Sequence, residues 1–247
     1  MALDFADRTD RSRPAALMPD QTTLAFDVYG TLIDPLGIAT TLRSFIGERA
    51  VPFAQAWREK QLEYLFRRAL MRDYRDFPAC TRQALEFVDA RFGTALTAEA
   101  IETLMHMYLE LPAYPEARAA LGRLRRRELR CYAFSNGHPD DLERLLQQAG
   151  LREMLDGVVS VHPVASYKPD PAVYLHFLAS TGAAAQCCWL VSGNAFDILG
   201  AQSVGWSAAW VRRDPDAVFD PWGVEPTLTV ADLGELAETI RRPPSNG

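Results

Sequence analysis

A short apolar run at residues 22–28 (TTLAFDV) stands alone in the sequence, because residues 36–111 separate it from any other strand-like segment. The run does not alternate polar and apolar residues, a pattern typical of a strand that is buried on both faces. Helical periodicity dominates residues 36–111, with breaks at Pro52, Pro78 and the segment 92–97, where Thr97 is expected to begin a helix. The lone strand must therefore pair with segments much later in the chain.

The sequence changes its pattern after Pro112 and Pro115, where strand-like and helix-like segments begin to alternate. Such alternation predicts a parallel sheet with right-handed crossovers. The expected strands cover residues 129–134, 157–160, 187–191, 207–211 and 227–229, and the expected helices cover residues 116–127, 139–149, 170–180 and 195–203.

We therefore predict an α/β fold with a doubly wound parallel sheet, a Rossmann-like core that is interrupted after its first strand by four or five helices. The core comprises residues 21–34 and 112–241, and the all-helical insert comprises residues 35–111. The charged, proline-broken residues 1–20 are expected to form a disordered leader, and residues 242–247 a flexible tail. Ligands of this architecture bind at the carboxyl ends of the strands, where the insert is expected to lie.

The composition fits a soluble protein of the cytoplasm. The chain is 48% hydrophobic and carries 26 basic and 32 acidic side chains, so its net charge of −6 argues against nucleic acid as the main partner. No apolar stretch approaches the length of a membrane span, and the first twenty residues lack the apolar core of a secretory signal. The four cysteines show no zinc-binding spacing, which fits small buried side chains in a reducing compartment.

Polar side chains follow four consecutive strands of the predicted sheet. They are Asp27 and Thr31 after the first strand, Ser135 and Asn136 after the second, Lys168 after the third, and Ser192, Asn194 and Asp197 after the fourth. Each one alone is ordinary turn chemistry, and Asp27 could merely cap its turn. Four such groups at one edge of a parallel sheet instead favour a catalytic site.

The charges of this group predict a nucleophile. Two carboxylates, Asp27 and Asp197, close to the single ammonium of Lys168 would leave Asp27 ionised. An ionised and partly desolvated carboxylate can form a covalent ester with an electrophile. The Ser135 hydroxyl, with the amides that begin the following helix, could bind an anionic part of the substrate.

Four motifs carry a family resemblance: D-x-Y-G-T-L at 27–32, S-N-G at 135–137, Y-K-P-x-P-x-V-Y at 167–174 and S-x-N-x-F-D at 192–197. They resemble the motifs of the haloacid dehalogenase superfamily and, more narrowly, those of the L-2-haloacid dehalogenases. The helical segment WREKQLEYLFRRALM also resembles the cap domain of that family. The resemblance spans residues 22 to about 240 and implies a capped Rossmann-like hydrolase.

The resemblance also indicates why position 29 is a tyrosine. Phosphatases of the superfamily have a second aspartate at this position, which protonates the alcohol leaving group, whereas a departing halide needs no proton. Asn194 likewise stands where phosphatases commonly carry a further acidic residue, which leaves Asp197 as the main candidate magnesium ligand. We therefore expect a site without metal and an enzyme without cofactor.

The resemblance also assigns roles in binding the halide and in hydrolysis. Arg58 matches the cap arginine that contacts the departing halide, and the spacing of Arg58, Leu62, Leu65 and Ala69 would place it on the apolar face of its helix. Asn136 and Phe196 match the other halide contacts, and the expected apolar lining consists of Tyr29, Leu62 and Phe77. Lys168 and Asp197 would then orient or activate the water, supported by Ser192 and Asn194. Tyr174 matches a residue near the catalytic lysine, and Thr31 is also expected among the catalytic residues. Glu59, His138 and Gly193 depart from common family patterns.

The predicted reaction is hydrolytic dehalogenation of short L-2-haloalkanoic acids to D-2-hydroxy acids through an aspartyl ester. Two other functions stay open: a magnesium-dependent phosphatase of the same superfamily and a non-catalytic binding module on this fold. The predicted partner is a small 2-haloacid, with neither nucleic acid nor membrane, and a homodimer is expected because family members are often dimers. The sequence leaves the preferred halogen, the chain length and the use of fluoroacetate undecided.

Overall fold

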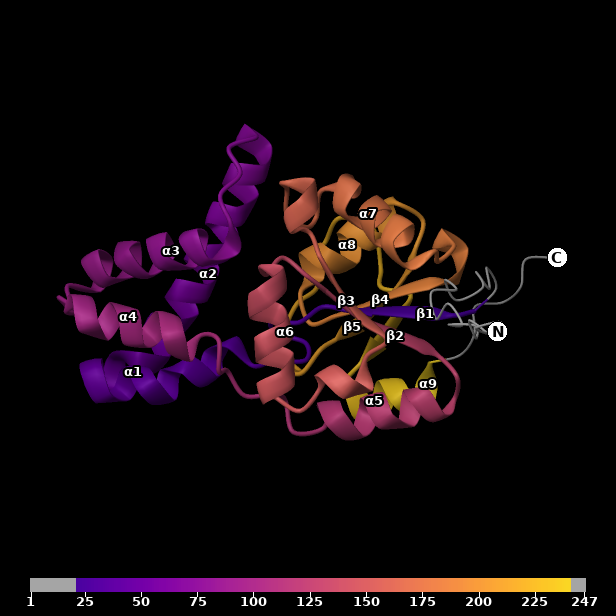
Figure 1. The fold of residues 1–247 in the computed structure, drawn as a ribbon, viewed down its shortest axis with the longest axis horizontal. Coiled ribbons are helices and arrows are strands. Elements are labelled where there is room, and N and C mark those ends of the chain that lie inside the picture. The colour runs from indigo at the N-terminus through magenta and orange to yellow at the C-terminus, as the bar shows by residue number, and fades with distance from the viewer. Residues whose placement is uncertain (1–20, 241–247) are drawn as a thin grey trace, which may run out of the picture.

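The computed structural model describes residues 21–240, so the predicted leader at 1–20 and the predicted tail at 242–247 lie outside the described residues. Figure 1 shows two bodies side by side: a helical insert, and a sheet covered by helices. The strands are β1 (Thr23–Phe26), β2 (Arg130–Ser135), β3 (Gly157–Ser160), β4 (Cys188–Ser192), β5 (Ser207–Val211) and β6 (Leu228–Val230). The helices are α1 (Ala39–Ile46), α2 (Ala50–Met71), α3 (Phe77–Phe92), α4 (Ala98–Met107), α5 (Ala117–Arg126), α6 (Pro139–Gln148), α7 (Pro171–Thr181), α8 (Ala195–Ser203) and α9 (Leu233–Thr239).

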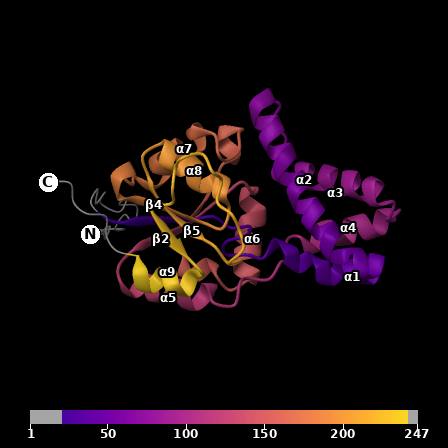
Figure 2. The same ribbon diagram turned by 180° about the vertical axis from the view of Figure 1, so that it is seen from behind.

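The six strands form one sheet in the order β3-β2-β1-β4-β5-β6, and every neighbouring pair is parallel. Helices α5 and α9 cover one face of the sheet, and α7 and α8 cover the other, as Figures 1 and 2 show. The predicted doubly wound α/β core is thereby confirmed. The chain leaves β1 toward β2 on one side and leaves β4 toward β5 on the other, so the topological switch point lies between β1 and β4.

The register of β1 brings the expected site residues together. Phe26 pairs with Ala133 of β2 and with Val191 of β4, so Asp27 is level with the next residues, Phe134 and Ser192. The Asp27 amide extends this pairing by donating a hydrogen bond to the Val191 carbonyl at 2.9 Å. The first strand is shorter than the predicted 22–28, because the chain turns immediately after Asp27.

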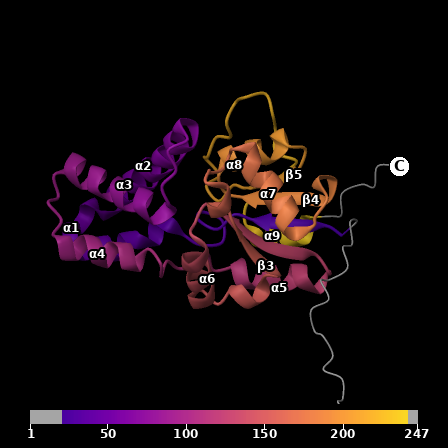
Figure 3. The same ribbon diagram turned by 45° about the horizontal axis from the view of Figure 1, so that its top comes forward.

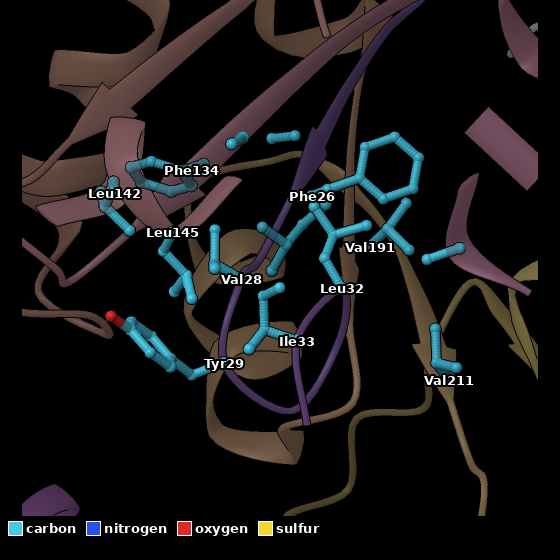
Figure 4. Packing of buried hydrophobic residues seen from close by; sticks show 14 of the residues in the cluster. Phe26, Val28, Tyr29, Leu32, Ile33, Phe134, Leu142, Leu145, Val191 and Val211 are labelled. Carbon is cyan, nitrogen blue, oxygen red and sulfur yellow. The ribbon is translucent and has the colours of Figure 1, made fainter. Parts of the chain in front are cut away.

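The turn after β1 is anchored by apolar packing. Figure 4 shows Val28, Leu32 and Ile33 in the same cluster as Phe134 of β2 and Val191 of β4. The ring of Tyr29 lies at the edge of this cluster, and its hydroxyl points away from the other labelled side chains. The backbone of Asp27 is therefore held by the core, while the ring of Tyr29 lies at the edge of that core.

The insert consists of the four helices α1 to α4, within the four or five that the sequence predicts. Figure 3 shows it beside the core at the end of the sheet toward which β1 runs. Two of its helices begin at capping side chains: Asp76 caps α3 by accepting a hydrogen bond from the Ala79 amide, and Thr97, where the sequence predicts a helix start, caps α4 through the Ala100 amide. The use of this insert as a cap over the site remains a proposal.

The sequence pattern missed α9. Asp232 accepts a hydrogen bond from the Glu235 amide, and the Glu235 carboxylate accepts one from the amide of Ala231. This exchange resembles a capping box, and its signal, Asp followed three residues later by Glu, is present in the sequence.

Within residues 21–240 no helix is long and apolar enough to cross a membrane.

Candidate active site

The candidate site is centred on Asp27, whose two carboxylate oxygens have different surroundings. Oδ2 accepts a hydrogen bond from the Thr31 hydroxyl at 3.0 Å and one from Nδ2 of Asn194 at 2.8 Å. Oδ1 accepts only a longer contact from the Lys168 ammonium, at 3.3 Å. Because all three neighbours are donors, the arrangement is complementary to a carboxylate anion, and Oδ1 is the less engaged of its two oxygens.

Lys168 joins the two carboxylates of the site. Its ammonium donates to Asp27, to Oδ2 of Asp197 at 2.9 Å and to the Phe134 carbonyl at 2.7 Å. Its side chain is 1% exposed, and that of Asp197 is completely buried. All three hydrogens of the ammonium are therefore used, which fixes its position at the carboxyl ends of β1 and β2.

Asp197 belongs to the first turn of α8, the helix that follows β4. Besides Lys168, it binds the Tyr174 hydroxyl of α7, which donates to Oδ1 at 2.8 Å. Burial and the nearby Asp27 raise the pKa of Asp197 above its ordinary value, although the contact with Lys168 acts in the opposite direction. Burial likewise raises the pKa of the Tyr174 hydroxyl, so it remains a proton donor to the carboxylate.

The loop after β4 is tied to the turn after β1. The Gly193 amide donates to the Thr31 hydroxyl at 2.9 Å, and Thr31 in turn donates to Asp27. The Asn194 amide group also donates to the Tyr29 carbonyl at 3.2 Å, while the Ser192 hydroxyl accepts from the Asn194 backbone at 3.0 Å. Since Asp27 and the Tyr29 carbonyl both present oxygen to Asn194, its amide nitrogen faces them and its carbonyl oxygen is turned away from Asp27.

This donor set does not fit a magnesium ion. Lys168 lies between the two carboxylates, and Asn194 presents nitrogen rather than oxygen to Asp27. Magnesium needs several oxygen ligands in octahedral geometry. Within residues 21–240 no group of three His, Cys, Asp or Glu side chains is arranged to hold a metal ion. That the reaction needs no metal remains a prediction.

Arg58 of α2 reaches the core from the insert. Its Nη2 donates to the Tyr29 carbonyl at 3.2 Å, and its Nη1 donates to Oε1 of Gln61 at 2.8 Å. The buried stripe of α2 runs through Trp57, Gln61 and Leu65, so Leu65 of the predicted face is buried, whereas Arg58 and Leu62 lie one residue beyond the stripe. Arg58 lies at the edge of that stripe and is half-buried, so the prediction that it sits on the apolar face needs this correction.

Aromatic rings from the insert cover Tyr29. Phe77 of α3 stacks on it at a ring-centroid distance of 5.0 Å, and Tyr108, just after α4, stacks at 5.7 Å. Burial is the main cause that raises the pKa of Tyr29 well above its ordinary value. The expected apolar lining at Tyr29 and Phe77 is thus a continuous aromatic surface between core and insert.

The remaining expected residues have weaker connections to Asp27. Oδ1 of Asn136 accepts from the Lys168 backbone amide at 3.0 Å, and buried Ser135 accepts from the Gly137 amide, with no hydrogen bond from Ser135 to either carboxylate. Phe196 packs edge-on against Phe66 of α2 at 5.0 Å. Leu62 is half-buried one turn beyond Arg58.

Of the three departures from the family pattern, Gly193 belongs to the site through its amide, whereas Glu59 and His138 lie away from Asp27. Glu59 is exposed, and His138 packs its ring against that of His162 at a centroid distance of 4.7 Å. Nothing in the geometry connects either side chain to Asp27. The motifs and spacings gave no indication of Tyr108, and the only signal for Gln61 is a polar residue on the buried stripe of α2.

Comparisons with known proteins identify the family of this chain. A family model described as haloacid dehalogenase-like hydrolase matches residues 22–205. The chain belongs to this family of hydrolases, and the resemblance carried by the four motifs is confirmed.

Two curated relatives are similar to this chain over most of its length. An (S)-2-haloacid dehalogenase of Pseudomonas sp. (strain YL) is 35% identical over 215 residues, which cover 87% of this chain and 92% of the relative. The haloacetate dehalogenase H-2 of Moraxella sp. (strain B) is 30% identical over 217 residues, 88% of this chain and 96% of the relative.

A solved structure, that of an L-2-haloacid dehalogenase from Xanthobacter autotrophicus with chloropropionic acid covalently bound, superposes with a TM-score of 0.83 at 30% identity. The match covers 88% of this chain and 97% of that chain.

Proposed function

We propose that this protein hydrolyses short L-2-haloalkanoic acids to D-2-hydroxy acids through an ester formed on Asp27. The observation that carries the proposal is the asymmetry of Asp27: Oδ2 is engaged by Thr31 and Asn194, whereas Oδ1 has only the longer contact with Lys168. The (S)-2-haloacid dehalogenases that match most of the chain support it, as does the covalent complex of one such enzyme.

In the first step, Oδ1 of Asp27 attacks C2 of the substrate from the side opposite the halogen. A carbon–oxygen bond forms while the carbon–halogen bond breaks, and the electron pair leaves with the halide, so the configuration at C2 inverts. The halide takes no proton, which suits an aromatic Tyr29 beside the nucleophile. Arg58 stabilises the negative charge that develops on the halogen.

The other binding residues act around these atoms. Asn136 and Phe196 contact the halide together with Arg58, while the Ser135 hydroxyl and the amides at the start of α6 bind the substrate carboxylate. The apolar substituent at C2 lies against Leu62, Phe77 and the ring of Tyr29. The insert thereby acts as a cap that supplies Arg58 and the apolar wall.

In the second step, water attacks the carboxyl carbon of the ester and gives its proton to Asp197. A raised pKa makes the buried Asp197 a stronger base than an exposed aspartate. Negative charge develops on Oδ2, where Thr31 and Asn194 are already arranged as donors. Collapse breaks the bond between the carboxyl carbon and Oδ1, and the leaving alkoxide takes the proton back from Asp197 to become the hydroxy acid. Asp27 keeps one oxygen from water and loses the second proton of that water to solvent.

Two further residues support this step without touching the ester. Tyr174 holds Asp197 through its hydroxyl, and Ser192 holds the loop that carries Asn194. Lys168 places its positive charge between the two carboxylates, with its ammonium donating to both. These roles complete the set of candidate catalytic residues.

A single turnover in heavy-oxygen water tests the ester. With enzyme in excess over 2-chloropropionate, the first product should contain ordinary oxygen, and the peptide that contains Asp27 should gain the heavy isotope. Mass spectrometry of product and peptide measures both. Heavy oxygen in the first product, with none in the peptide, would exclude attack by Asp27 and favour direct attack by water.

A substrate screen separates this reaction from its rivals. Halide release should occur with the (S) enantiomer of 2-chloropropionate and with chloro- or bromoacetate, and fluoroacetate tests the strongest carbon–halogen bond. Magnesium-dependent turnover of a phosphate ester without halide release would support the phosphatase, and ligand binding without any turnover would support the binding module.

A homodimer in the cytoplasm is also part of the proposal. The unpaired cysteines within residues 21–240 fit the reducing environment of the cytoplasm.

A further inference from the structure

Gln61 is a completely buried polar residue in the middle of α2. Its amide has three partners, each from a different part of the insert. Nε2 donates to the Thr81 hydroxyl of α3 at 2.5 Å, and Oε1 accepts from the Tyr108 hydroxyl at 3.0 Å and from Arg58 at 2.8 Å. A buried amide with this many partners is held in one orientation.

The direction of these hydrogen bonds follows from their donors. The Thr81 hydroxyl donates its own hydrogen to the Phe77 carbonyl at 2.8 Å, so toward Gln61 it can only accept. The amide nitrogen of Gln61 must therefore face Thr81, and its carbonyl oxygen must face Arg58. Hydrogens are thus donated in one direction, from the Arg58 guanidinium to Gln61, from Gln61 to Thr81 and from Thr81 to the Phe77 carbonyl.

Both acceptors that hold Arg58 are neutral. Nη1 binds the amide oxygen of Gln61, and Nη2 binds the backbone carbonyl of Tyr29. Across residues 21–240 no carboxylate forms an ion pair with Arg58, and its neighbour Glu59 is exposed. The two contacts fix the plane of the guanidinium and leave its positive charge available to an anion.

We infer that Gln61 is a positioning residue that orients Arg58 toward the departing halide without neutralising its charge. The inference rests on the proposed function. It explains why a glutamine rather than a glutamate is suitable here: a glutamate would form an ion pair with Arg58 and would offer Thr81 no donor. Gln61 does not touch the substrate and acts only through Arg58.

The test compares Gln61→Glu with Gln61→Met. Gln61→Glu retains an acceptor but neutralises Arg58, so we expect kcat for 2-chloropropionate to fall about 100-fold and product inhibition by bromide to weaken at least about tenfold. Gln61→Met keeps the volume but loses the acceptor, and we expect a fall in kcat of about tenfold. Leu65→Ala, one turn further along the same buried stripe, is the matched control: it should lower the melting temperature but leave bromide inhibition unchanged.

A binding measurement makes the test independent of turnover. Bromide should raise the melting temperature of the wild-type protein relative to fluoride at equal ionic strength, and this rise should vanish in Gln61→Glu and in Arg58→Ala. If bromide inhibits and stabilises Gln61→Glu as strongly as it does the wild-type protein, the inference is overturned while the proposed function stands. If the wild-type protein releases no halide from 2-haloacids, the proposed function is wrong. If bromide also fails to stabilise the wild-type protein, the inference about Gln61 is overturned too.

Discussion

Lys168→Met would leave the carboxylates of Asp27 and Asp197 together in the protein interior without their ammonium. Methionine fills a similar volume and cannot donate a hydrogen bond. The substitution removes contacts at 3.3 Å and 2.9 Å to the two carboxylates and one at 2.7 Å to the Phe134 carbonyl. Because the lysine side chain is 1% exposed, water cannot replace these contacts without opening the core.

The cost has an upper limit set by protonation, because one carboxyl group can take up a proton rather than remain charged. Protonating an aspartate with an ordinary pKa near 3.9 costs about 4 kcal/mol at pH 7 and about 1.5 kcal/mol at pH 5. The unpaired Phe134 carbonyl adds about 1 kcal/mol. We expect the free energy of unfolding to fall by about 3–5 kcal/mol at pH 7, in line with the loss of one partner of a buried ion pair.

The sign of the pH dependence follows from Asp197. Its pKa is already raised by burial in the folded protein, and the loss of Lys168 removes the contact that lowers it. The folded variant therefore binds more protons than its unfolded chain, so its stability is greatest below the ordinary aspartate pKa and falls as the pH rises through the raised value. The difference from the wild-type protein should shrink to about 2 kcal/mol at pH 5.

Urea unfolding at both pH values measures this difference, and Lys60→Met is the matched control. Lys60 is the other lysine of the sequence. Its side chain is 15% exposed, pairs with the single carboxylate of Glu63 and lies over the Phe87 ring, so its loss should cost about 1–2 kcal/mol and should not differ between the two pH values. Adding Asp197→Asn to Lys168→Met should recover about 2 kcal/mol or more at pH 7. A loss in Lys168→Met that equals the control, or that does not change with pH, would refute the reasoning.

Three further outcomes follow from the site. Arg58→Ala should lose about 2–4 kcal/mol of transition-state stabilisation, about 100- to 1000-fold in kcat, and a rate within threefold of wild type would return Arg58 to the surface. Halide release should survive exhaustive chelation of metal ions. A loss of activity that magnesium restores would contradict the prediction, drawn from the position of Lys168 between the carboxylates, that the reaction needs no metal. Gly193→Ala should lower kcat about tenfold and stability by about 1–3 kcal/mol, because its Cβ would lie 2.4 Å from the Gly30 carbonyl oxygen; unchanged steady-state kinetics would show that the loop shifts freely.

The sheet and the polar half of the site could be predicted from the sequence because both depend on local patterns. A buried strand is recognisable from its apolar run, and parallel strands bring their carboxyl ends to one edge. Asp27, Lys168 and Asp197 can therefore be grouped by strand order alone, although Asp27 and Lys168 are 141 residues apart. The contacts between them confirm the grouping, while their catalytic roles remain proposals.

The interior of the insert could not be predicted in the same way. The spacing of apolar residues predicts the buried face of a helix only to within about one residue. The pattern therefore places Arg58 on the buried face, whereas Trp57 and Gln61 are the buried residues at that position of α2. The partners of Gln61 come from α3 and from the segment after α4, and no periodicity records which helices meet. Side-chain hydrogen bonds across helices depend on packing, which one sequence does not specify.

The central position of β1 has a consequence for the synthesis of this chain. β1 is made first, yet its two neighbours in the sheet begin at Arg130 and Cys188. At about 5–20 residues per second, the second neighbour is synthesised about 8–33 s after β1. During that interval the helices of the insert can form from contacts that are close in sequence, while the apolar β1 waits without partners on either edge. Of the strands, β1 is therefore exposed longest on the nascent chain, which makes this apolar segment an expected binding site for chaperones that hold unfolded chains.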